Sequence, residues 1–387
     1  MNKKLSILFD LTPYSLESFS GSGRAIFNLL EELFILDKTN QYFVFSFEES
    51  LKEKLKFPKN FKYVYLKRKK LFGPFSREIA RRRFVYRTCK QNKIDIVHFN
   101  LDPYNAGSKA VSINFLHDVM HLNPRFKKYT KTGIRVKLRA YLRCLIAKRS
   151  DYLLVNSNYT KTEVCTRLKI KPEKVKVISF GVEKHFSNGE INYKILENYN
   201  INGKYILFVG RYGSQKNELL VLKSFLTLLE KKAISDELTL VMVGDMKNLT
   251  KQFIVYLNKS SKKKHVNFIN YISDEDLAQI YRGSSLFIFP SYEEGFGLPV
   301  LEAMSCGTPI ITSNVSSLVE VTGDAGILVS PWNQSEIESG ICNLLKNNGL
   351  RKKLISAGYK QASKYSYSKG AEQILDLYNN ILKSKNS

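Results

Sequence analysis

Two carboxylates, Glu294 and Glu302, lie eight positions apart on either side of a loop that contains two glycines. Gly295 and Gly297 allow the backbone to turn tightly and to expose its N–H groups. Pro299 suits the first turn of a following helix, and the N-terminus of that helix favours an anion such as phosphate. Because carboxylate oxygens accept hydrogen bonds from sugar hydroxyls, the whole arrangement suits a sugar nucleotide.

A second group of candidate residues follows another predicted strand. Arg211 and Lys216 lie in the loop after the apolar segment 205–210. When a sugar leaves a nucleoside diphosphate, negative charge develops on the β-phosphate, and fixed cations and N–H donors stabilise that charge. We therefore expect Arg211 and Lys216 to supply the positive charge.

The pair Asp274 and Asp276 has the Asp-x-Asp spacing with which some transferases hold a divalent metal. Ser273 precedes these acids, however, and a serine followed by acidic residues is typical of the capped first turn of a helix. We therefore expect no metal site, so that the two cations and the loop amides must stabilise the leaving group.

The first half of the chain contains two further candidate segments. Gly21 and Gly23 precede a predicted helix over 26–34, where the backbone could approach an anion closely. No third glycine completes a dinucleotide fingerprint, which argues against a dehydrogenase. His117 and Asp118 follow a predicted strand, and a histidine beside an acid at a strand's carboxyl end is commonly a site residue. Two alternatives stay open: His117 could be a packed structural histidine, and Gly21 and Gly23 could form a plain turn at the start of a helix.

The elements that must position these residues alternate between short apolar strands and helices, as in a doubly wound parallel sheet. In the first half, strands are predicted at 6–10, 42–45, 63–66, 94–99, 112–116, 152–156 and 175–178. In the second half, they are predicted at 205–210, 238–244, 266–269, 286–290, 309–312 and 326–329. A polar segment between 181 and 203 separates the two sets. The sequence thus predicts two Rossmann-like domains, and ligands of such sheets bind at the carboxyl ends of the strands.

The net charge of +26 is concentrated in the first part of the chain. Residues 1–200 carry 39 Lys and Arg against 18 Asp and Glu, whereas residues 201–387 carry 22 against 17. Residues 134–149 combine apolar side chains at helical spacing with many cations, so they predict a basic amphipathic helix. Such a helix could lie on an anionic membrane, or its apolar face could pack on its own domain.

Several classes of protein are excluded or made less plausible by composition. No segment approaches about twenty uninterrupted apolar residues, so we expect no membrane-spanning helix. The five cysteines are scattered, which favours a reducing cytosol and packing roles. Nucleic-acid binding would use the basic charge, but no recognition motif accompanies that charge and the carboxylate pair would stay unexplained. We expect no nucleic-acid partner.

The segment 290–309 resembles the C-terminal signature of the retaining glycosyltransferases of family 4, which have the two-domain GT-B fold. The residues that carry this resemblance are Glu294, Gly295, Phe296, Gly297, Leu298, Pro299, Glu302, Ala303 and Met304. Residues 210–217 resemble the diphosphate-binding loop of the family, although Gln215 stands where many members carry an additional arginine. Residues 20–25 resemble the glycine loop of the family's N-terminal domain, and 116–124 resemble the His-Asp element of its mannosyltransferase-like members.

This resemblance implies a role for each candidate residue. Glu294 would lie near the transferred sugar, and Glu302 would bind the ribose hydroxyls. Arg211 and Lys216 would grip the phosphates. The remaining donor-binding residues implied by the family are Gly21, Gly23, Gly295, Phe296, Gly297 and Leu298. His117 would face the transferred sugar and Asp118 would orient its loop.

The resemblance also implies an architecture. We expect an acceptor-binding domain over 1–190, a nucleotide-sugar-binding domain over 191–366, a cleft between them, and a helix over 367–387 that packs back on the first domain.

The function expected from this resemblance is metal-independent, retaining transfer of a hexose in cell-envelope polysaccharide or lipopolysaccharide biosynthesis. GDP-mannose is the favoured donor and a UDP-hexose is the alternative, and no cofactor is expected. The acceptor would be a saccharide, lipid-linked if the basic helix docks on an anionic membrane. The protein would then be cytoplasmic and peripheral on the inner face of the membrane. Because no carboxylate nucleophile is identifiable, we expect retention by a front-face route.

Overall fold

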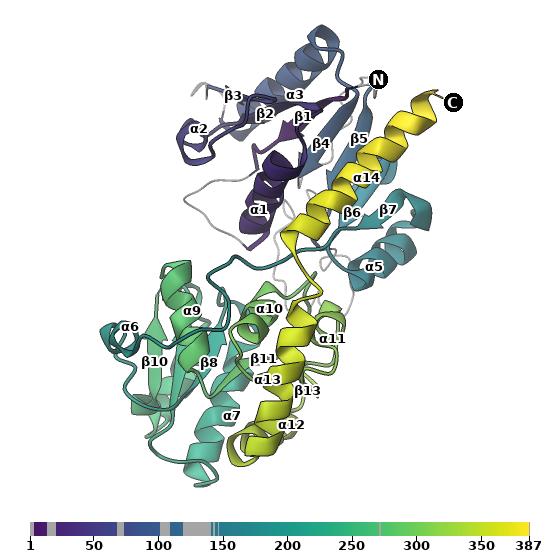
Figure 1. The fold of residues 1–387 in the computed structure, drawn as a ribbon. Coiled ribbons are helices and arrows are strands. Elements are labelled where there is room, and N and C mark those ends of the chain that lie inside the picture. The colour runs from purple at the N-terminus through teal and green to yellow at the C-terminus, as the bar shows by residue number, and fades with distance from the viewer. Residues whose placement is uncertain are drawn as a thin grey trace. The chain divides into compact units, whose positions relative to one another are not determined.

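The computed structural model of the chain describes residues 4–13, 21–67, 73–100, 109–118, 141, 144–145, 147–270 and 272–386. These residues form two compact units. The first unit contains the described residues up to 118, those from 141 to 180 and those from 366 onward, and the second unit contains residues 181–365. Each unit is a parallel β-sheet layered with helices, as the alternating apolar segments predict (Figure 1).

The first unit has a seven-stranded sheet in the order β3-β2-β1-β4-β5-β6-β7, in which all neighbours are parallel. Its strands are β1 (Ser6–Asp10), β2 (Gln41–Ser46), β3 (Phe61–Tyr65), β4 (Ile96–Asn100), β5 (Val111–Phe115), β6 (Tyr152–Val155) and β7 (Val175–Val177). Its described helices are α1 (Gly21–Leu36), α2 (Leu51–Lys54), α3 (Gly73–Gln91), α5 (Asn158–Leu168) and α14 (Tyr367–Asn386). The strand order reverses at β1 and β4, the place where such sheets bind ligands.

The second unit has a six-stranded parallel sheet in the order β10-β9-β8-β11-β12-β13. Its strands are β8 (Tyr205–Val209), β9 (Thr239–Val243), β10 (Val266–Ile269), β11 (Leu286–Phe289), β12 (Ile310–Ser313) and β13 (Gly326–Val329). Its helices are α6 (Tyr193–Asn198), α7 (Glu218–Glu230), α8 (Lys251–Lys259), α9 (Asp274–Gly283), α10 (Leu298–Ser305), α11 (Ser317–Thr322), α12 (Gln334–Lys346) and α13 (Asn348–Ala362). Its strand order reverses at β8 and β11.

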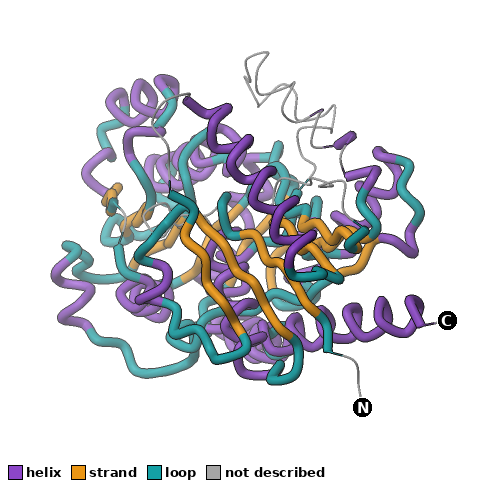
Figure 2. The backbone as a smooth tube through the Cα atoms, turned by 90° about the horizontal axis from the view of Figure 1, so that it is seen from above, coloured by secondary structure: helices purple, strands orange, loops and turns teal. Residues whose placement is uncertain are grey.

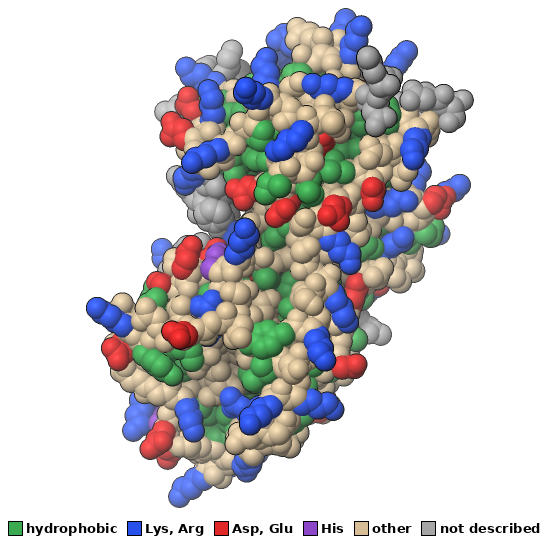
Figure 3. All heavy atoms as spheres, in the orientation of Figure 1, with side chains coloured by type: hydrophobic (Ala, Val, Ile, Leu, Met, Phe, Trp, Pro, Cys, Tyr) green, Lys and Arg blue, Asp and Glu red, His purple; other side chains and the backbone are tan. Residues whose placement is uncertain are grey.

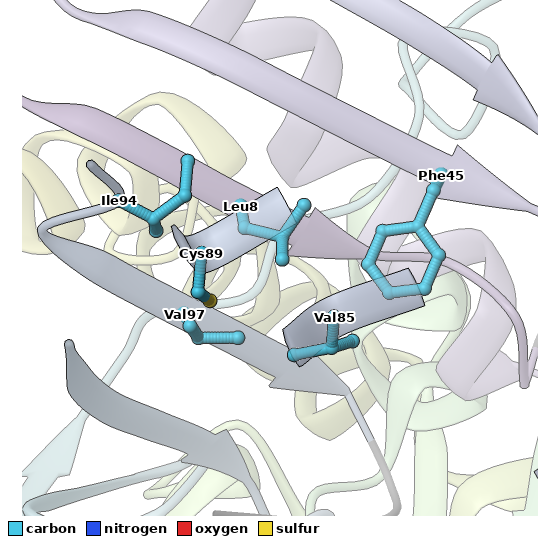
Figure 4. Packing of buried hydrophobic residues seen from close by; sticks show 6 residues of the cluster. All are labelled: Leu8, Phe45, Val85, Cys89, Ile94 and Val97. Atoms are coloured by element: carbon cyan, nitrogen blue, oxygen red, sulfur yellow. The ribbon is translucent and has the colours of Figure 1, made fainter. Parts of the chain in front are cut away.

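Successive side chains of a strand point to opposite faces of the sheet, and in the first unit each face packs on its own helix layer. Leu8 of β1 lies on the α3 side, in a buried cluster made of Leu8, Phe45, Val85, Cys89, Ile94 and Val97 (Figure 4). Cys89 therefore has the packing role expected for the cysteines. Phe9, the next residue, instead contacts the ring of His98, with 4.5 Å between the ring centroids.

The last helix, α14, belongs to the first unit and packs against α1. The hydroxyl of Tyr378 in α14 lies 2.8 Å from Nδ1 of His98 in β4, and both side chains are buried. The N–H of Ser179 donates to Oε1 of Gln373 at 2.8 Å. Burial lowers the pKa of His98 to about 3, so this histidine is neutral and serves to attach the helix.

The units divide at residue 181 rather than at the expected residue 191. The reason is visible in the hydrogen bonds of the segment that follows Phe180. Arg282 of α9 donates to the carbonyl oxygens of His185 and Ser187, at 2.6 and 2.8 Å. These bonds tie the polar segment to the second unit.

The backbone tube shows strands between helices, as expected for layered α/β units (Figure 2). Figure 3 shows Lys and Arg side chains distributed over one face of both units. Residues 68–72 and 119–140, which contain many of the cations of the sequence, lie outside the described residues. In the described part of the chain, no helix has both the length and the apolar character needed to cross a membrane.

Candidate functional site

The second unit holds an ion pair at the carboxyl edge of its sheet. Nζ of Lys216, in the loop after β8, lies 2.5 Å from Oε1 of Glu294, in the loop after β11. The two side chains are 19% and 12% exposed, so a ligand could reach both. The Lys216 ammonium also lies 5.1 Å from the centre of the Phe289 ring. Arg211, in the same loop as Lys216, is exposed.

Hydrogen bonds between the two loops fix the positions of these charges. The carbonyl oxygen of Gln215 accepts from the N–H of Tyr292 at 3.0 Å and from the hydroxyl of Ser291 at 3.1 Å. The Gln215 side-chain amide donates to the carbonyl oxygen of Glu293 at 2.8 Å. The neutral Gln215 side chain therefore joins the two loops and adds no charge.

Asn217 adds a third connection that sequence reasoning missed. Its side-chain amide donates to the carbonyl oxygens of Pro290 and Pro331, at 3.1 and 2.7 Å, and it is buried. Its φ is 61°, a left-handed conformation that asparagine adopts more readily than most residues. An asparagine directly after Lys216 was the signal available in the sequence.

The glycine loop between the two carboxylates adopts the geometry that its residue types predict. Gly297 has φ 113°, and a Cβ there would lie 2.7 Å from the side chain of Leu318. Helix α10 begins at Leu298, with proline in its first turn, as expected. The Ser317 hydroxyl contacts the carbonyl oxygens of Glu294 and Phe296, 2.8 Å from each, so α11 supports the loop.

Phe296 differs from the other predicted donor-binding residues of this loop. Its side chain is 4% exposed and packs edge-on against Tyr365, with 5.5 Å between the ring centroids. The side chain therefore anchors the loop in the core, and a contact with a donor would fall to the Phe296 backbone. Gly295 and Leu298, its neighbours in the loop, are half-buried.

Glu302 lies in the second turn of α10 and is only 1% exposed. The hydroxyl of Tyr281 in α9 donates to its Oε2 at 3.0 Å. This carboxylate is far less accessible than that of Glu294, a difference in burial that the sequence did not predict. Its predicted contact with ribose hydroxyls stays a prediction.

Sequence reasoning also missed Glu218, a buried carboxyl group at the start of α7. It lies in the chain two residues after Lys216, one of the phosphate-loop candidates. Its Oε1 accepts from the N–H of Gly213 at 3.2 Å, and burial raises its pKa. The nearby Tyr212 ring is 2% exposed and lies against Gly244, where a Cβ would collide with the carbonyl oxygen of Gly210. Within the described residues, neither Oε2 of Glu218 nor the Tyr212 hydroxyl has a hydrogen-bond partner.

In the first unit, His117 follows β5 as predicted and is 8% exposed. Its ring stacks on Phe115 at 4.6 Å between centroids and lies 6.0 Å from Phe180. This apolar burial lowers the pKa of His117 to about 3, so the imidazole is neutral at physiological pH. Asp118, next to it, is exposed. His117 could offer a hydrogen bond to a sugar, but it supplies no cation.

Gly21 and Gly23 lie in the first turn of α1, whereas the sequence reasoning placed them in a loop before a helix that starts at residue 26. The correction has a physical reason, since the buried apolar stripe of α1 stabilises the helix despite its two glycines. That stripe includes Ile26, Leu29, Leu30 and Leu33. A helix N-terminus with glycines still exposes backbone N–H groups.

The first unit also contains a buried ion pair that the sequence did not suggest. Nε of Arg81 in α3 donates to Oδ2 of Asp10 at 2.7 Å, at the carboxyl end of β1. The other oxygen of Asp10 accepts from the N–H and the hydroxyl of Thr12, at 2.8 and 2.7 Å. Asp10 therefore fixes the direction in which the chain leaves β1.

Two remaining predictions have different outcomes. Ser273 caps α9 by accepting from the N–H of Asp276 at 3.1 Å, which confirms that the Asp-x-Asp pattern is the first turn of a helix. The proposed basic helix over 134–149 falls mostly outside the described residues.

The structure brings together Arg211, Lys216 and the 294–302 segment in one unit, while Gly21, Gly23, His117 and Asp118 belong to the other.

Models of two protein families match this chain, one in each half. The model described as "Glycosyltransferase Family 4" matches residues 19–186, and the model described as "Glycosyl transferases group 1" matches residues 194–361. The O-antigen chain mannosyltransferase B of Escherichia coli is 37% identical over 122 residues, which is 32% of this chain and 32% of that protein. The match thus spans about a third of the curated relative's length.

Solved structures share the fold over nearly the whole chain. A glycosyltransferase from Rickettsia africae ESF-5 is 22% identical, with a TM-score of 0.76, and the match covers 98% of this chain and 99% of that one. Anabaena Alr3699/HepE in complex with UDP-glucose is 16% identical, with a TM-score of 0.74, and the match covers 97% of this chain and 100% of that one. These similarities confirm the predicted GT-B fold.

Proposed function

Because the chain belongs to the glycosyltransferases of family 4, we propose that it transfers a hexose from a nucleoside-diphosphate sugar to a saccharide acceptor. The observation that carries this proposal is the ion pair of Lys216 and Glu294, 2.5 Å long, four residues before α10 begins. A cation, a carboxylate and a helix N-terminus near one another match a ligand that has both phosphates and hydroxyls.

In this proposal the phosphates bind at Arg211, Lys216 and the first N–H groups of α10. A diphosphate there would share the Lys216 ammonium with Glu294 and leave the Glu294 carboxylate to accept hydrogen bonds from the hexose. The loop connections through Gln215 and Asn217 hold these groups in place before the reaction, so that little reorganisation is needed.

The transfer step retains the configuration of the sugar. The bond between the anomeric carbon and the phosphate oxygen breaks, and its electron pair stays on the diphosphate. The acceptor hydroxyl oxygen forms the new bond on the same face, and its proton moves to the departing phosphate oxygen. Arg211, Lys216 and the α10 amides stabilise the diphosphate charge without a metal ion.

Mannose is the favoured hexose and GDP-mannose the favoured donor. The resemblance of the His117 segment to mannosyltransferase-like sequences supports this choice, as does the similarity to an O-antigen chain mannosyltransferase. A UDP-hexose is the second candidate, favoured by the shared fold with a protein solved with UDP-glucose. The neutral imidazole of His117 can hydrogen-bond a hydroxyl of either hexose, so this residue does not decide between the two donors.

The acceptor would be a cell-envelope saccharide, lipid-linked and reached from the inner face of the cytoplasmic membrane. The excess of cations in residues 1–200 supports docking on an anionic surface. Sedimentation with phosphatidylglycerol vesicles should show binding that weakens as salt rises. Absence of binding at both low and physiological salt would remove the membrane from the proposal and leave the transfer reaction standing.

A panel of sugar nucleotides tests the activity itself. We expect one donor, GDP-mannose or a UDP-hexose, to raise the Tm of the protein and to be hydrolysed slowly in EDTA. If no donor is bound or hydrolysed with or without added Mg²⁺ and Mn²⁺, the proposed function is wrong. Hydrolysis that EDTA abolishes and Mg²⁺ or Mn²⁺ restores would instead overturn its metal-independence.

A further inference from the structure

The chain has a single tryptophan, Trp332, and its side chain is 47% exposed. Trp332 follows β13, and its ring lies 5.8 Å from the ring of Tyr292, between centroids, with an angle of 31° between the ring planes. Tyr292 lies two residues before Glu294 in the loop after β11. The ring of the exposed Trp332 thus meets the half-buried ring of Tyr292 beside the segment that carries the candidate sugar-side carboxylate.

Both rings belong to segments that are bonded to the Lys216 loop. The carbonyl oxygen of Pro331, next to Trp332, accepts from the Asn217 side chain at 2.7 Å. The N–H of Tyr292 donates to the carbonyl oxygen of Gln215 at 3.0 Å. The rings are therefore carried by the same cross-linked set of loops as the cations. A flat aromatic surface held in this way loses little conformational entropy when it binds a ligand.

The chemistry of exposed aromatic rings indicates what they would bind. The face of an indole or phenol ring is electron-rich, and it attracts electron-poor hydrogens as well as apolar surface. A pyranose ring has one face lined by C–H groups, while its hydroxyls lie around the edge. Phosphates gain nothing from such a surface, because they are recognised by cations and N–H donors.

We propose that Trp332 and Tyr292 form a stacking platform for one hexose ring of the saccharide acceptor. The inference rests on the proposed transfer function and adds a specificity-determining surface in the second unit. The donor's phosphates have their own candidate partners in Arg211, Lys216 and α10. A neutral saccharide lacks such charged contacts, so the aromatic pair contributes mainly to acceptor affinity.

Fluorescence of the single tryptophan reports directly on this platform. Titration with neutral hexose oligosaccharides, such as mannotriose and maltotriose, should change the emission of Trp332 in a saturable way. Tyr292→Ala should raise the apparent Kd by about tenfold. If GDP or UDP alone changes the emission and no oligosaccharide does, the rings hold the nucleobase and the inference is wrong.

Kinetics separate acceptor binding from donor binding. Trp332→Ala should raise the KM for the acceptor by about tenfold and the KM for the donor by less than twofold, and Trp332→Phe should restore most of the loss. Tyr193→Ala is a matched control, because Tyr193 is an exposed aromatic residue of α6, 67% exposed. It should change neither KM.

The failures of the two proposals can be distinguished. If the wild-type protein hydrolyses a donor but Trp332→Ala leaves the acceptor KM unchanged, the platform is wrong and the transfer function stands. If no donor is hydrolysed, the transfer function is wrong. The fluorescence titration needs no turnover, so a flat response to every oligosaccharide would then overturn the platform independently.

Discussion

The order of strands β1 to β6 in the first unit is the same as that of β8 to β13 in the second, yet the two units present different chemistry at their candidate sites. In the second unit, Lys216 and Glu294 are charged partners that stay partly exposed at the edge of the sheet. In the first unit, the candidate residue His117 is buried among aromatic rings, and burial lowers its pKa to about 3. The candidate site of the second unit therefore has an accessible ion pair, whereas the candidate histidine of the first unit is neutral and packed.

The difference arises from how the loops are held. In the second unit, side-chain and backbone hydrogen bonds from Gln215 and Asn217 fix two loops to each other, so charged side chains need no burial to be positioned. In the first unit, His117 is positioned by ring packing against Phe115 and Phe180. Packing among these rings buries the imidazole of His117, and burial without a charged partner disfavours its charged form.

The largest expected effect is on catalysis in the second unit. Lys216→Met should lower kcat/KM by about 100- to 1,000-fold, the usual loss when one group that stabilises developing negative charge is removed. Steady-state kinetics with the preferred donor measure this change. Lys223→Met is the matched control, because the Lys223 ammonium instead lies 5.4 Å from the Tyr256 ring centre. A loss below tenfold in Lys216→Met would show that Lys216 does not stabilise the leaving diphosphate.

The two carboxylates should respond differently to the same kind of change. Glu294→Ala should lower kcat by about 10- to 100-fold, because the proposed function places this carboxylate against the sugar that is transferred. Glu302→Ala should mainly raise the donor KM. It should also lower the Tm, because the buried hydroxyl of Tyr281 loses its acceptor. Near wild-type kinetics in both variants would contradict the roles assigned to the pair.

Local patterns predicted much of the fold, and these successes have physical reasons. Apolar runs located the strands, because a parallel strand buried on both faces needs continuous apolar residues. Gly297 and Pro299 located the start of α10, and Ser273 located the start of α9, since turn and cap chemistry depends on neighbouring residues. The start of α1 was misplaced because its glycines are poor helix formers in isolation.

The arrangement of the site could not be predicted in the same way. Lys216 and Glu294 are 78 positions apart, and their contact depends on β8 and β11 being neighbours in the sheet. The side-chain hydrogen bonds of Asn217 reach Pro290, which follows β11, and Pro331, which follows β13, so they also depend on how the strands are arranged. The burial of Glu302 follows from the packing of α9 on α10, which no spacing within the 294–302 segment reveals.

Acid should act on the histidines of the first unit. The folded pKa of His117 is about 3, and the ordinary value is 6.5, so the unfolded chain binds an extra proton between these values. Stability should therefore fall as pH decreases from about 6.5 toward 3, by up to about 1.4 kcal/mol per pH unit. His117→Phe should make thermal unfolding less sensitive to pH in this window. An identical pH dependence in the variant would show that His117 is not buried in a neutral state.

Glu218 should show the opposite pH dependence in the second unit, with the smallest effect. Burial raises its pKa, so its contribution to stability is present below the unfolded pKa and is lost as pH rises through the folded value. Glu218→Gln keeps an acceptor for the Gly213 N–H and removes the buried charge. It should raise the Tm by a few °C at pH 7 and by little at pH 4. A lower Tm at pH 7 would show that the charge is stabilised by its surroundings.

Calorimetric binding of GDP and UDP in EDTA, to wild-type protein and to Lys216→Met, tests the central claim that side chains and amides of the second unit hold the diphosphate. We predict that the wild-type protein binds one of the two nucleotides without metal, and that the variant binds it at least tenfold more weakly. Equal affinity of the two proteins, or binding that appears only after Mg²⁺ or Mn²⁺ is added, would contradict the account.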